Sequence, residues 1–266
     1  MSEPRLTHLA VYLQRLGYDA PPAPTLETLR LLQRRHTGAF AFENLTTLSG
    51  EPVLIDLPYV EQKVLLEGRG GYCYELNSLY LALLKELGFD ARGISGRVVM
   101  GQPEGAWTAR THRLSLVTLG GVRYITYVGF GGMVPTAPLI LDSTTEQLTP
   151  HEPYRIEQHD DGYTLRANVA GEWKAMYIFD LQRQEDIDYA VGNWYVSTHP
   201  ESSFRKQLMV ARTGEGWRRT LNNGSFAIHR VGSESERRQV ADVDELVALL
   251  AREFGIRVPE HAGLKR

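Results

Sequence analysis

Apolar side chains recur at helical spacing along the first ninety residues. Leucines three or four positions apart over residues 6–16 stop at Gly17, which predicts a first helix. Thr25 stands where a capping side chain would and predicts a second helix over residues 26–36. A shorter helix is expected over residues 59–67. The chain is therefore expected to begin as a helical unit.

The clearest helical pattern follows Cys73. From Leu76 to Leu87, apolar residues fall at i, i+3, i+4, i+7, i+8 and i+11, and Gly88 comes next. This spacing places them on one face of a helix, and glycine is common just past a helix end. The sequence thus predicts a helix that begins near the cysteine.

Beyond about residue 90 the pattern changes to short segments separated by glycine pairs. Such a pattern is typical of an antiparallel sheet or barrel, with candidate strands at residues 93–100, 111–119, 122–128, 163–167 and 173–179. A last, mixed part begins near residue 186 and ends in a helix that Asp242-Val243-Asp244-Glu245 would cap. We therefore expect three domains, over residues 1–90, 91–185 and 186–266.

Composition narrows the class of protein. The 266 residues carry a formal charge of −3, which gives no general attraction to nucleic acid or to anionic membranes. No apolar stretch approaches the ~20 residues that cross a bilayer, and the N-terminus lacks the pattern of a signal peptide. The arginine pairs at residues 34–35, 218–219 and 237–238 are too short for a binding tract, so we expect solvated faces there. A protein of the reducing cytoplasm fits this composition.

Cys73 is the only cysteine. It cannot form an internal disulfide, and one thiol is too few for a thiolate metal cage, so we expect no metal. An inert core cysteine and a nucleophile remain as alternatives. Gly70 and Gly71 would let the chain turn tightly before the sulfur, and the start of a helix would lower the pKa of the thiol. This placement favours the nucleophile.

A cysteine nucleophile needs a base, and His112 is the candidate among eight histidines. It shares a strand face with two leucines, where a histidine is more often a core residue than a catalyst. A Gly-Gly turn at residues 120–121 suits a two-residue hairpin whose register sets Leu114 opposite Tyr127. Tyr127 is then diagonal to His112 on the same face, roughly 7–8 Å away at the backbone. The hairpin has the geometry of a base and its orienting group, but a tyrosine holds the orienting position.

The exit from this strand is rich in glycine. In Val128-Gly129-Phe130-Gly131-Gly132, backbone amides could approach a ligand closely, and Phe130 could supply an apolar wall. A flexible turn is an equal alternative from glycine content alone. The segment matches neither a Walker nor a dinucleotide-binding motif.

Taken together, these segments resemble the arylamine N-acetyltransferase family. The resemblance rests on RGGYCYELN around Cys73, on THRLSLV around His112 and on the YxxxVGFGG pattern that includes Tyr127. A FENL segment at residues 42–45 and an STxPxSxF segment at residues 197–204 strengthen it. The similarity covers essentially the whole chain in the family's order.

The resemblance implies an α+β fold: a helical first domain, a central antiparallel β-barrel and a C-terminal α/β lid, around the Cys-helix and His-strand core of cysteine proteinases. It also implies ping-pong acetyl transfer from acetyl-CoA to aromatic amines, hydrazines or N-hydroxyarylamines. Cys73 would accept the acetyl group and His112 would be its base. The other implied site residues are Phe42, Phe130 and Phe204 in the substrate cleft, Gly131 and Gly132 beside CoA, and Arg69 and Glu43 as supports of the cysteine loop.

The third triad position departs from the family. Members of the family carry aspartate where this chain has Tyr127. A neutral phenol cannot stabilise an imidazolium as a carboxylate does. We therefore expect weakened pairing of Cys73 with His112 and strongly reduced acetyl transfer, since losing such an orienting carboxylate elsewhere costs about 10⁴-fold in rate.

Two alternatives stay open on the sequence alone. A cysteine hydrolase or transglutaminase-like enzyme would share the Cys-helix and the His-strand. A non-enzymatic form of the same scaffold, binding CoA or aromatic compounds, would follow if Tyr127 abolished turnover.

Overall fold

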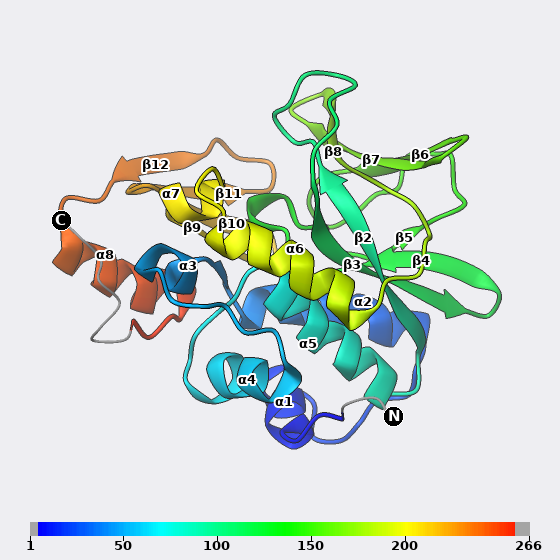
Figure 1. Cartoon of the computed structure of the whole chain (residues 1–266), viewed down its shortest axis with the longest axis horizontal. Coiled ribbons are helices and arrows are strands. Elements are labelled where there is room, and N and C mark those ends of the chain that lie inside the picture. Colours follow the sequence, from blue (N-terminus) through cyan, green and yellow to red (C-terminus); the bar gives the residue numbers. More distant parts are fainter. Residues whose placement is uncertain (1–4, 259–266) are drawn as a thin grey trace.

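The structure is a computed structural model that describes residues 5–258, and it has an α+β fold (Figure 1). Helices of the first part lie below an antiparallel barrel and a second sheet. The elements of the first part are α1 (Leu9–Arg15), α2 (Leu26–Ala39), β1 (Phe42–Glu43), α3 (Leu45–Ser49), α4 (Leu57–Glu61), the π-helical turn η1 (Gln62–Leu66) and α5 (Cys73–Glu86).

The predicted helices of the first part are confirmed, with one shorter than expected. The Thr25 hydroxyl accepts a hydrogen bond from the amide of Thr28 and caps α2. Gly88 follows α5 with φ of +85°, a left-handed conformation that suits glycine. The first helix begins at Leu9 rather than at residue 6, and the amides of Thr7 and His8 just before it donate to the carboxylate of Glu61.

Seven antiparallel strands form the barrel, in the order β5-β4-β3-β2-β8-β7-β6. They are β2 (Asp90–Val98), β3 (Arg110–Leu119), β4 (Val122–Thr126), β5 (Leu139–Ile140), β6 (Tyr154–His159), β7 (Gly162–Val169) and β8 (Glu172–Phe179). Gln147 joins the two edge strands, because its side chain bonds both backbone groups of Ile140 and its main chain pairs with Tyr154. The sheet is therefore nearly closed.

The predicted hairpin of β3 and β4 is present in the expected register. Both glycines of the 120–121 turn have positive φ, and Ser115 pairs with Thr126 as Leu119 pairs with Val122. Ladder pairing ends at Thr126, so Tyr127 lies just beyond the strand. His112 and Tyr127 both face the barrel interior, because their rings lie next to each other there.

The last part contains helices and a second antiparallel sheet, of order β1-β9-β10-β11-β12. Its elements are α6 (Asp186–Thr198), α7 (Ser203–Lys206), β9 (Met209–Gly214), β10 (Trp217–Asn222), β11 (Ser225–Arg230), β12 (Glu236–Gln239), α8 (Val243–Leu249) and the π-helical turn η3 (Leu250–Phe254). Asp242 caps α8 as expected, accepting from the amide of Glu245. The edge strand β1 comes from the first part, so the sheet ties the two ends of the chain together. The domain boundaries at residues 90 and 185 stay predictions, and residues 259–266 of the third lie outside the described chain.

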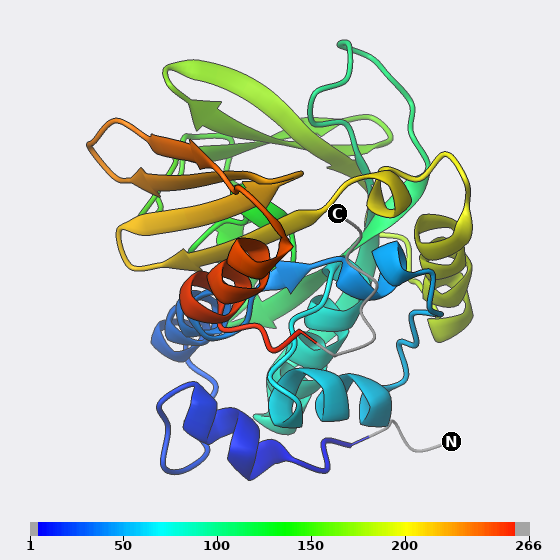
Figure 2. The same ribbon diagram turned by 90° about the vertical axis from the view of Figure 1, so that its left-hand side faces the viewer.

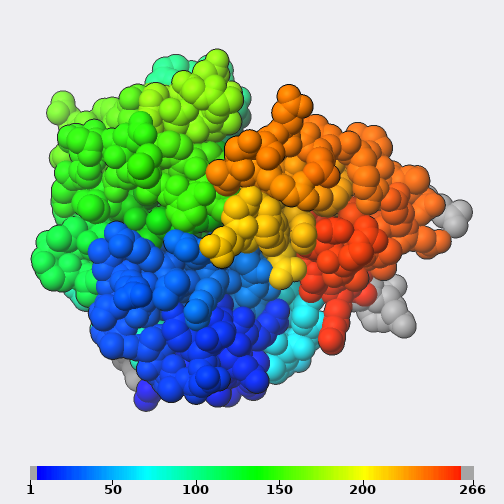
Figure 3. All heavy atoms as spheres, turned by 180° about the vertical axis from the view of Figure 1, so that it is seen from behind, coloured from blue at the N-terminus to red at the C-terminus, as the bar shows by residue number. Residues whose placement is uncertain are grey.

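The buried apolar residues form three clusters. Figure 3 shows from behind that the three parts of the chain pack against one another. Cys73 belongs to the cluster among the helices, whereas Tyr127 and Phe130 belong to the one inside the barrel. The candidate site thus lies where the helical core, which holds Cys73, meets the barrel core. Within residues 5–258, no helix is both long and apolar enough to cross a bilayer.

The helical core also encloses a histidine that no site uses. His36 lies on α2 with its ring 4.8 Å from that of Phe40 and 5.6–5.7 Å from those of Tyr12 and Tyr80. Neither of its ring nitrogens has a hydrogen-bond partner among the described residues. Burial lowers the pKa of His36 to about 3.

This histidine predicts acid sensitivity. Unfolded histidine has a pKa of about 6.5, so the stabilisation from neutral His36 is complete above that pH and is lost as pH falls toward 3. The free energy of unfolding of the native chain should fall when the pH is lowered from 7 to 5. In His36→Phe this fall should be smaller by about 2 kcal/mol. Urea unfolding of both proteins at the two pH values measures this difference. Equal losses would contradict the prediction.

Candidate functional site

Cys73 lies at the first residue of α5, where the sequence placed it. Its side chain is only 5% exposed. The thiol donates to the carbonyl oxygen of Thr111, with 3.6 Å between Sγ and O. A side chain at Gly129 would place its Cβ 3.1 Å from Cα of Cys73. The cysteine is thus enclosed between the His112 strand and the glycine-rich segment.

The thiol differs from expectation in its acidity. Burial raises the pKa of Cys73 to about 12, and hydrogen bonds from the main chain of Arg113 on β3 and of the first residues of α5 offset this only in part. The expectation of a lowered pKa was wrong for this structure, because it counted the helix dipole and not the loss of water. The thiol is therefore protonated near neutral pH.

The two glycines before the cysteine serve a different purpose from the predicted tight turn. Neither Gly70 nor Gly71 has positive φ. A Cβ at Gly70 would lie 2.1 Å from the carbonyl oxygen of Ala41, and one at Gly71 would lie 2.8 Å from Cβ of Glu75. Position 70 needs glycine because the cysteine loop passes directly against the start of β1, and position 71, which bridges to β1, needs it because the Glu75 side chain of α5 lies against it.

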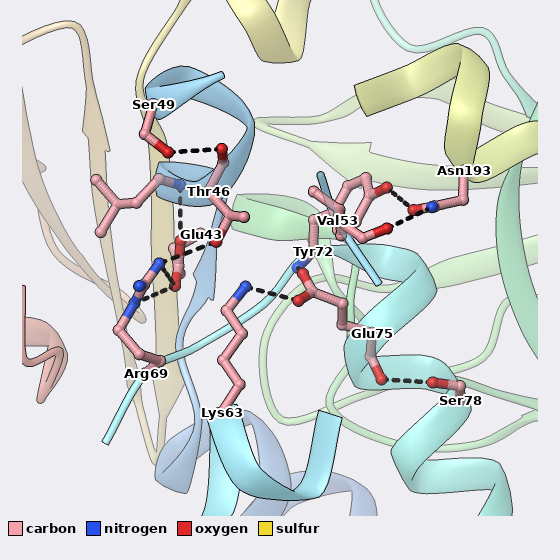
Figure 4. A network of polar contacts seen from close by, with 11 residues as sticks. Glu43, Thr46, Ser49, Val53, Lys63, Arg69, Tyr72, Glu75, Ser78 and Asn193 are labelled. Atoms are coloured by element: carbon pink, nitrogen blue, oxygen red, sulfur yellow. Dashed lines mark hydrogen bonds and ion pairs between the residues drawn. The ribbon is translucent and has the colours of Figure 1, made fainter. Parts of the chain in front are cut away.

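Buried charges hold the cysteine loop (Figure 4). The Glu75 carboxylate accepts from the Tyr72 amide at 3.0 Å and from Nζ of Lys63 at 2.6 Å. Lys63 comes from the π-helical turn η1 and is almost fully buried. This pair fixes the first turn of α5, and the sequence analysis assigned no role to Lys63.

The second charge pair of the loop joins Arg69 to Glu43. Their side chains form an ion pair of 2.8 Å, and Glu43 also accepts from the Leu45 amide at 2.7 Å. The Lys63 ammonium and the Arg69 guanidinium lower the pKa of Glu43 despite its burial. The residues predicted as supports thus lie together between β1 and the cysteine loop (Figure 4).

His112 is buried in an aromatic cluster. Its ring centroid lies 4.8 Å from that of Phe130 and 5.2 Å from those of Tyr127 and Tyr177. Burial lowers the pKa of His112 to about 3. No carboxylate among the described residues offsets this, so the imidazole is neutral at physiological pH.

Tyr127 fills the third position without bonding to the imidazole. Its ring meets the His112 ring edge to face, and its hydroxyl is directed to the Tyr177 hydroxyl rather than to the imidazole, without hydrogen-bond geometry to any residue among 5–258. Nε2 of His112 is likewise buried and unpaired. Burial raises the pKa of Tyr127 well above the usual value for tyrosine. The phenol is therefore neutral and leaves the histidine without an orienting acceptor.

Asn77 connects all three positions, and the sequence analysis gave it no role. One turn after Cys73, its Oδ1 accepts from the amides of Val128 and Gly129 at 2.8 and 2.9 Å. Its Nδ2 donates to the carbonyl of Arg113 at 2.6 Å and to that of Gly129 at 3.3 Å. One buried side chain thus links the cysteine helix to the chain just after His112 and just after Tyr127. Its place within RGGYCYELN was the only sequence signal.

The predicted substrate residues divide into two groups. Phe42 and Phe204 have ring centroids 6.2 Å apart, and a Cβ at Gly131 would lie 3.7 Å from the Phe42 ring. Phe130 instead packs on His112 inside the barrel. Gly131 and Gly132 open a short 3-10 turn, η2 (Gly131–Met133), that contacts β9 and β10.

Arg218 corrects one expectation. The pair at residues 218–219 was expected on a solvated face, but Arg218 is only 3% exposed. Its guanidinium donates to the carbonyls of Gly132 and Val134, and to the Glu152 carboxylate. A surface arginine pair and a buried clamp look alike in sequence, because strand alternation buries only one of the two. Arg218 fixes the glycine-rich segment to the second sheet.

Comparison with known proteins adds to this geometry. A family model described as N-acetyltransferase matches residues 25–262. The arylamine N-acetyltransferase of Mycolicibacterium smegmatis is 40% identical, over 96% of this chain and 94% of that protein. The arylamine N-acetyltransferase / N-hydroxyarylamine O-acetyltransferase of Salmonella typhimurium is 38% identical, over 94% of this chain and 89% of that protein.

A solved structure agrees with these relatives. The arylamine N-acetyltransferase of Mycobacterium marinum, in complex with CoA, superposes with a TM-score of 0.89 at 44% identity, covering 93% of this chain and 92% of that one. The matches span the helices, the barrel and the second sheet alike. The chain is a transferase and belongs to the arylamine N-acetyltransferase family.

Proposed function

We propose that this chain transfers acetyl groups from acetyl-CoA to aromatic amines, hydrazines or N-hydroxyarylamines through an acetyl-Cys73 intermediate. The observation that carries the proposal is the position of Cys73 at the start of α5, hydrogen-bonded to the residue before His112. The names of the relatives support the aromatic amine and N-hydroxyarylamine acceptors, and the CoA complex of the Mycobacterium marinum protein supports the donor.

In this proposal His112 takes the thiol proton while Sγ of Cys73 attacks the acetyl carbonyl. The bond from carbon to the CoA sulfur breaks, and the departing thiolate takes the proton from His112. The amine then attacks the acetyl-cysteine, its surplus proton passes to His112, and the Cys73 thiol is restored. A thioester is broken in each half-reaction and no net proton is lost.

We propose further that Tyr127 impairs this cycle. With burial favouring both the neutral thiol and the neutral imidazole, formation of an ion pair must overcome both pKa shifts. A carboxylate at position 127 would stabilise the imidazolium, whereas the unpaired phenol does not. Should the barrier be too high for turnover, the chain would be a CoA- or aromatic-binding form of the scaffold.

We propose the remaining roles from the family resemblance, and the neighbours of each residue support them. Phe42 and Phe204 would line the acceptor cleft with Phe130 behind them, and the η2 turn at Gly131 and Gly132 would pass close to CoA. Arg69 and Glu43 would support the cysteine loop through their buried pair. An acetyl-enzyme that is stable in water and loses its acetyl group only when an amine is added would distinguish this function from that of a cysteine hydrolase.

Asn77 predicts a positioning effect. Asn77→Leu keeps the volume but leaves buried amides and carbonyls unpaired, so the three segments should shift apart. We expect kcat to fall by about 10²-fold, because small displacements of reacting groups have effects of that size. KM for acetyl-CoA should change far less.

Steady-state kinetics with circular dichroism check the Asn77 prediction. Ser78→Ala is the matched control, because the Ser78 hydroxyl bonds only the carbonyl of Glu75 in its own helix. The kcat of Ser78→Ala should stay close to the native value, whereas that of Asn77→Leu should be much lower. A folded Asn77→Leu protein with native kcat would show that Asn77 does not position the site.

A further inference from the structure

A cavity lies on the outer face of the barrel, away from the candidate site. Its volume is about 630 Å³, within the usual range for small-molecule sites. Its walls include none of Cys73, His112 and Tyr127. The floor is formed by β2, β7 and β8, and the roof by the loop of residues 99–109, which rises beside β7 and β8 at the top of Figure 1 and again at the top of Figure 2.

The roof is held in place at its base and at its tip. At the base, Arg97 donates to the carbonyl of Thr108 at 2.6 Å, and the Thr108 hydroxyl donates to the carbonyl of Val98 at 2.9 Å. At the tip, Glu104 pairs with Arg166 of β7 at 2.6 Å. The loop therefore arches over the sheet, anchored at its base by the hydrogen bonds of Arg97 and Thr108.

Two tryptophans line this cavity, and one of them is unusually exposed. Trp107 in the roof is 71% exposed, although an indole gains much from burial. Trp173 of β8 lines the floor. The exposed indole face is suited to stacking with a flat aromatic ligand.

Among the described residues, one cation of the cavity is in no direct ion pair, although Arg97 is near enough to Asp180 to help lower the pKa of that carboxyl. Arg110 is paired with Asp180 through two bonds of 3.0 and 2.7 Å, and Arg166 is paired with Glu104 and Glu157. Arg97 forms no ion pair with any residue between 5 and 258, and its guanidinium lies 5.3 Å from the Trp107 ring centroid. It uses one nitrogen on Thr108 and keeps further donors for an anion.

We propose that this cavity binds a planar aromatic carboxylate. The ring stacks on Trp107, and the carboxylate accepts hydrogen bonds from Arg97, the arrangement for which a guanidinium is best suited. Four cations and three carboxylates line the cavity, so its wall is net positive even with Asp161 included. The other two carboxylates, Asp180 and Glu104, are paired with Arg110 and Arg166. An aromatic cation would instead meet Arg97. This site is separate from acetyl transfer and does not depend on it.

Calorimetric titration of the full chain with 2-naphthoate tests the proposal. We expect saturable binding, weakened about tenfold by Trp107→Ala, because ring stacking is lost, and by Arg97→Gln, because a charge-assisted hydrogen bond is lost. Trp107 stands exposed in a loop, so its removal leaves the fold intact. Trp194→Ala is the matched control, because Trp194 is a similarly exposed indole on α6, outside the cavity.

Two further titrations decide the site and the ligand class. The affinity for 2-naphthoate should be unchanged in Phe204→Ala, and 2-naphthylmethylammonium should bind at least about tenfold more weakly than the carboxylate. The proposal is overturned by absence of saturable binding, by equal affinity in Trp107→Ala and Arg97→Gln, or by loss of binding in Phe204→Ala. Equal affinity for the ammonium probe overturns the ligand class. None of these readouts requires turnover, so they stand whether or not the acetyltransferase proposal does.

Discussion

Tyr127→Asp is expected to raise kcat/KM for acetyl transfer, by as much as about 10⁴-fold. The new carboxylate would meet the unpaired Nε2 of His112 and stabilise the imidazolium that forms when the thiol loses its proton. Initial rates with acetyl-CoA and an arylamine measure the gain. The substitution also empties a fully buried ring position, at a cost of about 3–5 kcal/mol, so folding should be verified at the assay temperature.

Two control variants separate charge from space. Tyr127→Asn opens the same room without a charge and should recover little activity, and Tyr127→Phe should match the native chain because the hydroxyl has no partner. The pH dependence of Cys73 alkylation gives an independent reading. In the native chain its rate should rise about tenfold per pH unit through the neutral range, since the thiol pKa is about 12. A native plateau near pH 5 with full acetylation would refute the impairment.

Cys73→Ala is expected to abolish formation of the acetyl-enzyme. The chain has no other cysteine, so no second thiol can accept the group. Intact mass after incubation with acetyl-CoA should show a gain of one acetyl group, slow in the native chain and fast in Tyr127→Asp, and no gain in Cys73→Ala. This measurement reports both the class of enzyme and its competence.

Calorimetry with CoA completes the Cys73 experiment. Cys73→Ala should still bind CoA, because the change removes only a sulfur within a buried position. Retained binding without acetylation would assign the loss to the nucleophile. An acetyl group found on the variant protein would place the acceptor at another residue and overturn the role of Cys73.

Local sequence was sufficient for much of the fold. The Thr25 cap, the apolar face of α5 and the Gly-Gly hairpin depend on residues close together in the chain, and all three are confirmed. The short strands were harder. β1 has only two residues, and its pairing with β9 joins segments more than 160 residues apart, which no local pattern reports.

In the candidate site, too, local sequence placed some residues, whereas the roles of others depend on long-range contacts. Periodicity and motif order placed Cys73 at a helix start and His112 beside Tyr127, and these placements are confirmed. The roles of Asn77, Lys63 and Arg218 come from long-range hydrogen bonds and ion pairs, so the sequence alone did not indicate them. The solvated face expected for Arg218 was wrong for the same reason.

By itself the sequence determined where the proposed nucleophile, its proposed base and the tyrosine at position 127 lie, because motif order and spacing place each of them. Only the tertiary structure decided their protonation, because burial depends on what the rest of the chain packs around them. Removing water from Cys73 and His112 shifts their pKa values by more than a helix terminus does, and both groups are left neutral. The unpaired Tyr127 hydroxyl likewise became visible only once three distant segments were brought together.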